Sequence, residues 1–179
     1  MNLKTKQLFK LVMASVLIAL NIVLERLLTV QTESNHYNLS IITIVFAVVY
    51  LGMPYAIGIA ALGDIIGALL FPVGAYFPGF TFTNIVTALT LALLLRKNVK
   101  ILNTSLAVFI NKIVGSLILN PLWISILYRG GIDAYPAYMV TRIPQAVIML
   151  FVEIIVITLI FNDKSHIRKL LNKTVKKVI

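Results

Sequence analysis

The chain has 179 residues, of which 60% are hydrophobic and only 12% are charged, and its mean hydropathy is +0.98. A water-soluble domain needs about a quarter of its residues charged to cover its surface, so this composition indicates a protein embedded in a lipid bilayer. The absence of cysteine excludes disulfides, thiolate catalysis, iron–sulfur clusters and zinc fingers. With two histidines as well, we expect no metal site and no cofactor.

The N-terminal apolar stretch predicts an uncleaved first span. Lys4, Lys6 and Lys10 precede an uncharged run over residues 11–24, the arrangement of a signal peptide. No small residues that would mark a cleavage site follow this run, because Glu25 and Arg26 stand there. We therefore predict a retained transmembrane helix over residues 11–30.

The next apolar block, residues 39–71, is too long for one crossing. Its 33 residues would reach roughly 50 Å as a helix, whereas the hydrocarbon core of a bilayer is about 30 Å thick. Gly52-Met53-Pro54 supplies a break, because proline disfavours helix at the preceding residue and can begin a new one. This predicts spans over residues 39–51 and 54–71.

Later segments complete a single domain over residues 1–179. Proline and glycine in residues 72–79 end the third span, and further apolar stretches predict spans over 80–95, 104–128 and 138–161. Twelve of the sixteen basic residues lie in the N-terminal segment, the 96–103 loop and the tail after Phe161. Because cytoplasmic loops carry the excess of Lys and Arg, we predict an all-α integral membrane protein with six transmembrane helices and both termini inside. The basic clusters flank apolar spans and lack aromatic stacking residues, which argues against nucleic acid.

The C-terminal segment, residues 163–179, is basic and amphipathic. Ile167, Leu170, Leu171, Val175 and Val178 recur among its lysines at helical spacing. A helix of this kind suits the anionic inner surface of a membrane, and a partner-docking helix would have the same pattern.

Ionisable residues within the spans are expensive and therefore candidates for function. Lys112, Glu153 and Asp64 each lie about 12 to 15 Å from the inner ends of their spans, at about 1.5 Å per residue. We expect them to meet near the midplane. They form either a structural polar cluster, with Lys112 bridging the two carboxylates, or a relay for protons or cations.

A second layer of candidates lies in the outer half. Arg26 and Arg142 stand about four residues inside the outer ends of their spans and suit a ligand with carboxylates. The alternative is that their side chains reach the outer headgroups. Polar and aromatic residues in the same half could hold a flat heterocycle or form an interfacial belt: Asn120, Trp123, Tyr128, Tyr76 and Phe77.

Small residues indicate close helix packing. Ser15 and Ala19 form a small-xxx-small step in the first span, which could serve internal packing or another subunit. Sequence motifs of membrane proteases, serine hydrolases and phosphate-binding loops are absent, so we do not expect an enzyme. His36 and His166 fall outside the predicted spans, where we expect solvated side chains.

Residues 63–81, GDIIGALLFPVGAYFPGFT, carry the most specific pattern in the chain. This segment resembles the signature of the folate-specific S components (FolT) of energy-coupling factor (ECF) transporters. Residues 24–28, residues 120–128, and Arg142-Ile143 with Glu153 support the resemblance, which covers essentially the whole chain. Pro121 departs from the threonine expected there and Gln145 from the expected lysine, and the proline should bend span five beside the pocket.

The resemblance implies an ECF S-component-like bundle in a prokaryotic cell membrane that captures folate from outside with high affinity. The ligand would be folate or a related pterin. The partners would be a transmembrane coupling subunit and two ATPase subunits, with Ser15 and Ala19 at the docking surface. The alternatives are an S component for a different vitamin and a small proton-coupled carrier or channel that uses Asp64, Lys112 and Glu153.

Overall fold

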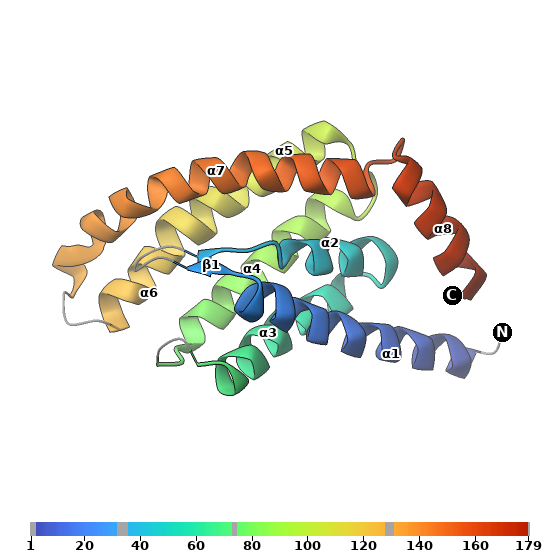
Figure 1. Cartoon of the computed structure of the whole chain (residues 1–179), viewed down its shortest axis with the longest axis horizontal. Helices are drawn as coiled ribbons and strands as arrows, with labels where there is room; N and C mark the ends of the chain where they lie inside the picture. Colours follow the sequence, from blue (N-terminus) through green and yellow to red (C-terminus); the bar gives the residue numbers. More distant parts are fainter. Residues whose placement is uncertain (1–2, 32–35, 73–74, 128–130, 179) are drawn as a thin grey trace.

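The chain folds as an all-α bundle with one short hairpin, as the sequence predicts for the fold class (Figure 1). The structure is a computed structural model and describes residues 3–31, 36–72, 75–127 and 131–178. Its helices are α1 (Leu3–Ile22), α2 (Ile41–Tyr50), α3 (Met53–Leu70), α4 (Pro78–Leu95), α5 (Ile101–Asn111), α6 (Asn120–Leu127), α7 (Tyr135–Phe161) and α8 (His166–Val178). The other elements are the π-helical segments η1 (Val23–Leu27) and η2 (Lys112–Leu119), the 3₁₀ turn η3 (Ile132–Ala134), and strands β1 (Val30–Gln31) and β2 (His36–Tyr37).

Several helices have the length and composition of membrane spans. In the described part of the chain, five continuous helical segments are long and apolar enough to cross a bilayer: Lys4–Leu27, Met53–Leu70, Pro78–Leu95, Ile101–Leu127 and Ile132–Phe161. Helix α2 is shorter, with 10 residues. The two termini lie at the same end of the bundle (Figure 1), as an even number of crossings requires.

The predicted break after α2 is present. Gly52 has a φ of +100°, a backbone conformation that only glycine adopts readily, and its N–H donates to the carbonyl of Ala47 over 2.8 Å. Pro54 follows in the first turn of α3, where the missing N–H costs nothing. The apolar block therefore turns back on itself after Tyr50.

The bundle is divided along its length into a packed half and a hollow half. The apolar core collects residues from the half that contains the termini, including Val48 on α2, Ile59 on α3, Leu91 on α4, Val108 on α5 and Phe161 on α7. Each of these helices also contributes residues to the walls of a cavity, and those residues lie toward the other end of the bundle. The fully packed half therefore supports a site in the other half.

Two π-helical segments adjoin the cavity. Segment η1 carries Glu25 and Arg26, and η2 begins at Lys112. Pro121 has no N–H to donate to the carbonyl of Leu117, and the Tyr135 hydroxyl lies 3.5 Å from that oxygen. A π-helical turn contains one residue more than an α-helical turn and so changes the direction of the side chains around it. These segments therefore determine the directions of the Glu25, Arg26 and Lys112 side chains.

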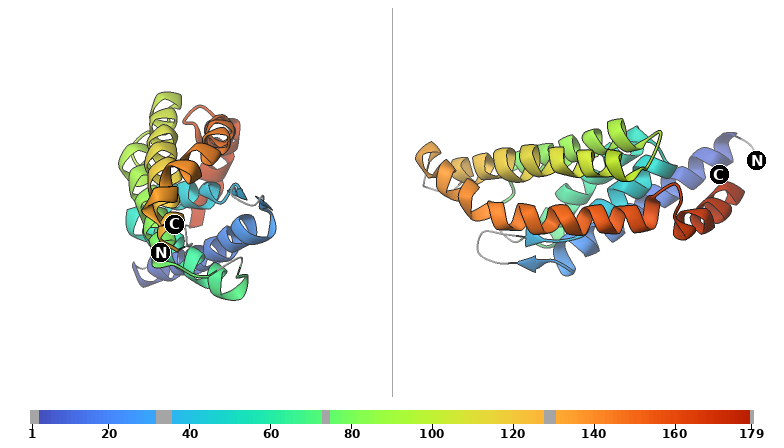
Figure 2. Two further views of the ribbon diagram at one scale, coloured as in Figure 1. Left: turned by 90° about the vertical axis from the view of Figure 1, so that its left-hand side faces the viewer. Right: turned by 90° about the horizontal axis from the view of Figure 1, so that it is seen from above.

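Two short strands join the segments predicted as the first and second spans. Strands β1 and β2 pair antiparallel, with Val30 opposite Tyr37 and Gln31 opposite His36. The hairpin lies beside α7 (Figure 2), and the Gln145 side-chain amide on that helix donates to the carbonyl oxygen of His36. A contact between residues this far apart in sequence attaches the hairpin to the rim of the cavity.

Candidate functional site

One end of the bundle encloses a cavity with a volume of about 680 Å³. This lies within the range of about 300 to 1,000 Å³ that is typical of small-molecule sites. Its walls come from the hairpin and from α2, α3, α4, the end of α5, η2, α6 and α7, with η1 at one side. Charged residues on the walls are Glu25, Arg26, Asp64, Lys112, Arg142 and Glu153.

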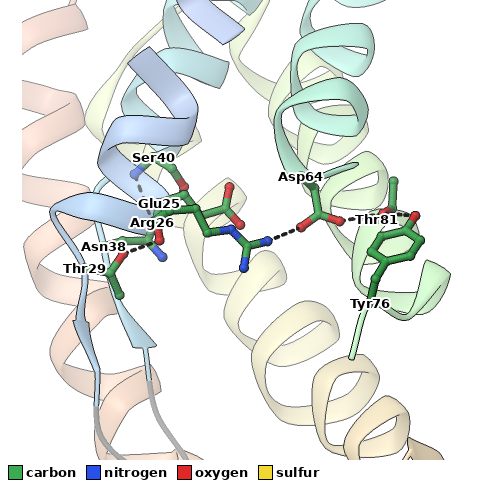
Figure 3. Close-up of polar contacts among 8 residues, drawn as sticks. All are labelled: Glu25, Arg26, Thr29, Asn38, Ser40, Asp64, Tyr76 and Thr81. Carbon is green, nitrogen blue, oxygen red and sulfur yellow. Dashed lines mark hydrogen bonds and ion pairs between the residues drawn. The ribbon is translucent and has the colours of Figure 1, made fainter. Parts of the chain in front are cut away.

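Arg26 is held by a chain of polar contacts (Figure 3). Its Nη2 lies 3.1 Å from Oδ1 of Asp64, whose Oδ2 accepts from the Thr81 hydroxyl over 2.5 Å. Since the single Thr81 proton goes to the carboxylate, the Tyr76 hydroxyl, 2.9 Å away, donates to Thr81. Both oxygens of Asp64 are therefore occupied, and the ion pair neutralises Arg26 within the protein.

Glycines in α3 permit this pairing. A Cβ on Gly63 would lie 2.6 Å from Oδ1 of Asn21, and a Cβ on Gly67 would lie 3.2 Å from Nε of Arg26. The α1–η1 segment thus approaches α3 closely enough for the Arg26 side chain to pass over the helix backbone. This is the close approach that small residues provide between membrane helices.

Lys112 and Glu153 form a second ion pair, with Nζ 2.6 Å from Oε1. The sequence predicted that Lys112 would bridge Asp64 and Glu153, but Asp64 pairs with Arg26 instead. The prediction counted depth along straight helices, whereas the long Arg26 side chain crosses between the two expected layers. Two separate neutral pairs replace the expected three-residue cluster, and this separation does not favour a continuous relay.

Arg142 differs from the other two cations of the cavity. Its residue is 6% exposed, and none of the ion pairs among the described residues includes it. His36 is exposed, as we expected, and it also lines the same cavity. Partial loss of hydration lowers the pKa of His36 from its usual 6.5, and the positive charges of Arg142 and Arg26 lower it further. At neutral pH the imidazole is therefore uncharged, and Arg142 supplies the cation at this position.

The aromatic candidates divide into two groups. Tyr76 and Phe77 line the cavity together with the polar residue Asn120. Trp123 does not: its Nε1 donates to the Thr83 hydroxyl over 3.0 Å, and its ring packs against Phe77 with centroids 5.8 Å apart. Trp123 therefore supports Phe77 from behind. Tyr128 lies outside the described residues.

Sequence reasoning missed several wall residues. Glu25, Asn84, Thr87 and Asn111 all line the cavity. The available signal was a polar stripe on α4, where Thr83 and Thr87 are four residues apart and so share a helix face. In the sequence, Glu25 served as a charge that ends the N-terminal apolar run and as part of the resemblance over residues 24–28, but it was not chosen as a site residue.

Ser15 and Ala19 lie away from the cavity. Both are exposed on α1, and the Ser15 hydroxyl donates to the carbonyl of Leu11 in its own helix over 3.1 Å. Neither residue takes part in the cavity walls. Their face is thus available for contact with another membrane helix.

Comparisons with known proteins identify the family. No family model matches the chain. The folate transporter FolT of Leuconostoc mesenteroides is 30% identical over 164 residues, which cover 88% of this chain and 88% of the relative. The folate transporter FolT of Clostridium novyi is 32% identical over 142 residues, which cover 79% and 81%. The chain belongs to the FolT family of folate transporters.

A solved structure agrees with this assignment. The crystal structure of a FolT protein bound with folic acid superposes with a TM-score of 0.75 at 28% identity, over 82% of this chain and 88% of the other. The chain is accordingly a multi-pass membrane protein of a family of transporters, not of enzymes. The resemblance drawn from residues 63–81 is confirmed at the level of the family.

Proposed function

We propose that this protein is the substrate-capture subunit of an ECF-type importer and binds folate, or a related pterin, with high affinity in the cavity described above. The observation that carries the proposal is Arg142, which has no ion-pair partner among the described residues and lines a cavity of about 680 Å³. Folate has an aromatic pterin at one end and two carboxylates at the other. Guanidinium binds carboxylate through parallel N–H donors, so Arg142 suits the glutamate end. The FolT names of the relatives support the choice of ligand.

In the proposed importer, the energy for uptake comes from other subunits. The sequence contains no G-x-x-x-x-G-K-[ST] motif to cradle nucleotide phosphates. In the proposed assembly, a transmembrane coupling subunit docks on this protein in the cell membrane, and two ATPase subunits drive it. The exposed face of α1 that carries Ser15 and Ala19 is the proposed docking surface.

Isothermal titration of the detergent-purified protein with folate tests the proposal. We expect saturable 1:1 binding, with a Kd below about 1 μM, or about 8 kcal/mol of binding free energy, without any ion gradient. A capture subunit must bind tightly by itself, whereas a channel need not. Riboflavin and biotin serve as control ligands. Absence of heat with folate together with binding of another vitamin would select a different S component and overturn the folate proposal.

A further inference from the structure

One carboxylate oxygen of Glu153, a residue that lines the cavity, has no hydrogen-bond partner among the described residues. Glu153 is 4% exposed, its Oε1 accepts from Lys112, and its Oε2 makes no hydrogen bond with any described residue. Buried polar atoms are nearly always paired in folded proteins, because an unpaired buried acceptor loses its hydration without compensation. The equivalent carboxylate on α3 differs, since both oxygens of Asp64 are occupied by Arg26 and Thr81. Glu153 therefore offers a free acceptor where Asp64 does not.

We propose that Glu153 recognises the pterin ring at the deep end of the cavity, with Oε2 accepting an N–H from the ring's 2-amino and N3 edge. This inference rests on the proposed function and extends it to the orientation of the ligand. Pterin presents two adjacent N–H donors on that edge, next to the carbonyl at C4. A carboxylate that faces this edge meets donors only, whereas an amide would present a competing N–H.

Asn111 offers the complementary group. Its Nδ2 is also buried without a hydrogen-bond partner among the described residues, and its residue is 6% exposed. It lines the cavity and immediately precedes Lys112, whose ammonium contacts Glu153. Oε2 of Glu153 can therefore accept from the N–H edge of the pterin, and Nδ2 of Asn111 can donate to its C4 carbonyl.

Lys112 acts as a positioning residue in this arrangement. Its Nζ lies 2.6 Å from Oε1 of Glu153, which fixes the carboxylate and leaves Oε2 for the ligand.

Helix α7 sets the distance between the two ends of the ligand. Arg142 and Glu153 are eleven residues apart, close to three full helical turns, so they share one face about 16 Å apart along the axis. The guanidinium lies toward the outer end and the carboxylate lies deeper. Folate has the matching polarity in extended form, with donors on the pterin and carboxylates on the glutamate. The pterin therefore enters first, and the glutamate stays beside Arg142.

The first experiment compares two ligands on one variant. Glu153→Gln keeps the size of the side chain but loses the charge and half of its acceptor capacity. We expect its affinity for folate to fall by roughly ten- to a hundredfold. Its affinity for p-aminobenzoylglutamate, which lacks the pterin, should equal that of the wild type. Asp133→Asn, the same chemical change at an exposed residue outside the cavity, is the control and should leave both affinities unchanged.

Equal losses for both ligands would overturn the inference, because Glu153 would then support the cavity as a whole. Unchanged folate binding in Glu153→Gln would overturn it as well. If the wild type binds no folate at all, the proposed function fails first, which is a distinguishable result.

A ligand-side measurement keeps the inference testable if Glu153→Gln does not fold. The wild type should bind 2-deaminofolate roughly tenfold or more weakly than folate, because the ligand loses an N–H that the carboxylate accepts. Equal affinities of the wild type for the two ligands would contradict a carboxylate at this edge. Where the variant folds, it should discriminate less between them than the wild type does.

Discussion

The cationic side chains of Arg26, Lys112 and Arg142 line the cavity. They differ in whether a carboxylate of the protein is paired with them. Arg26 faces Asp64 and Lys112 faces Glu153, with N···O distances of 3.1 and 2.6 Å. Arg142 has no such partner among the described residues. In a bilayer an uncompensated charge costs several kcal/mol, so the unpaired cation is the one that gains most from an anionic ligand.

Arg142→Ala should weaken folate binding by roughly ten- to a hundredfold, since hydrogen bonds to charged groups contribute about 1.5 to 3 kcal/mol each. Isothermal titration measures the change. Arg142→Lys serves as the matched variant: it keeps the charge but loses bidentate geometry, so it should recover part of the affinity. Full affinity in Arg142→Ala would place the ligand's carboxylates elsewhere.

Arg26→Ala should lower the stability of the folded protein, in contrast to Arg142→Ala. It leaves the buried Asp64 without its counter-charge, and breaking a buried pair costs about 3 to 5 kcal/mol. We expect a lower thermal unfolding midpoint for the ligand-free protein in detergent. The double variant Arg26→Leu/Asp64→Leu should recover part of that stability, because it removes both charges. An unchanged midpoint in Arg26→Ala would show that Asp64 finds another partner.

At the scale of elements, local chemistry allowed some features to be predicted and not others. Gly52 and Pro54 act through their own backbones, so the end of α2 and the start of α3 could be predicted. The π-helical segments η1 and η2 depend on how neighbouring helices pack, which no local pattern encodes. The β1–β2 hairpin depends on a contact with Gln145, more than a hundred residues away.

The candidate site shows the same limit. Arg26, Asp64 and Arg142 could be chosen as candidates because charge in an apolar span is conspicuous. Which carboxylate pairs with which cation could not be predicted, because it depends on the glycine contacts that bring η1 over α3. Trp123 could be placed near the site but not behind Phe77, since both positions suit an aromatic ring in the outer half.

Helix α8 gives a prediction at this scale. Arg168 is fixed at its start, where it pairs with Asp163 and donates to the carbonyl of Phe161 over 2.8 Å. Lys169 and Lys173 are exposed, while Leu171 packs against the core. We propose that these lysines contact anionic lipid headgroups at the inner surface, as the sequence pattern suggested.

Lys169→Gln/Lys173→Gln should therefore lower the affinity for phosphatidylglycerol several-fold per lysine, since each basic residue near such a surface contributes about 1 kcal/mol. Native mass spectrometry counts the lipids retained on the delipidated protein. Phosphatidylcholine is the control and should bind the variant and the wild type equally. Unaltered phosphatidylglycerol binding would favour the alternative, in which α8 docks on a partner protein.

At the scale of the whole molecule, we propose that folate capture and coupling use different surfaces. The cavity occupies the half of the bundle away from the termini, and the packed core fills the half that contains them. Helix α1 lies at the edge of the bundle, with Leu11, Val12 and Val16 more than half exposed. Substitutions on the exposed face of α1 can therefore alter the outer surface of the bundle without altering the cavity.

Ser15 and Ala19 lie on that outer surface, four residues apart on one face of α1. In lipid, such small residues allow two helix backbones to approach closely, so a bulky side chain there should prevent docking. We predict that Ser15→Trp and Ala19→Trp retain the folate affinity of the isolated subunit, measured by titration, but lose ATP-dependent folate uptake in vesicles that contain the coupling module.

The matched control for this pair is Leu20→Trp. Leu20 is also exposed, but the helix rotates by about 100° per residue, which turns its side chain well away from those of Ser15 and Ala19. This variant should bind and transport folate normally. Normal transport by Ser15→Trp and Ala19→Trp would mean that the coupling subunit docks on another face. Loss of folate binding in both would mean instead that the α1 face supports the cavity, and the assignment of capture and coupling to separate surfaces would be wrong.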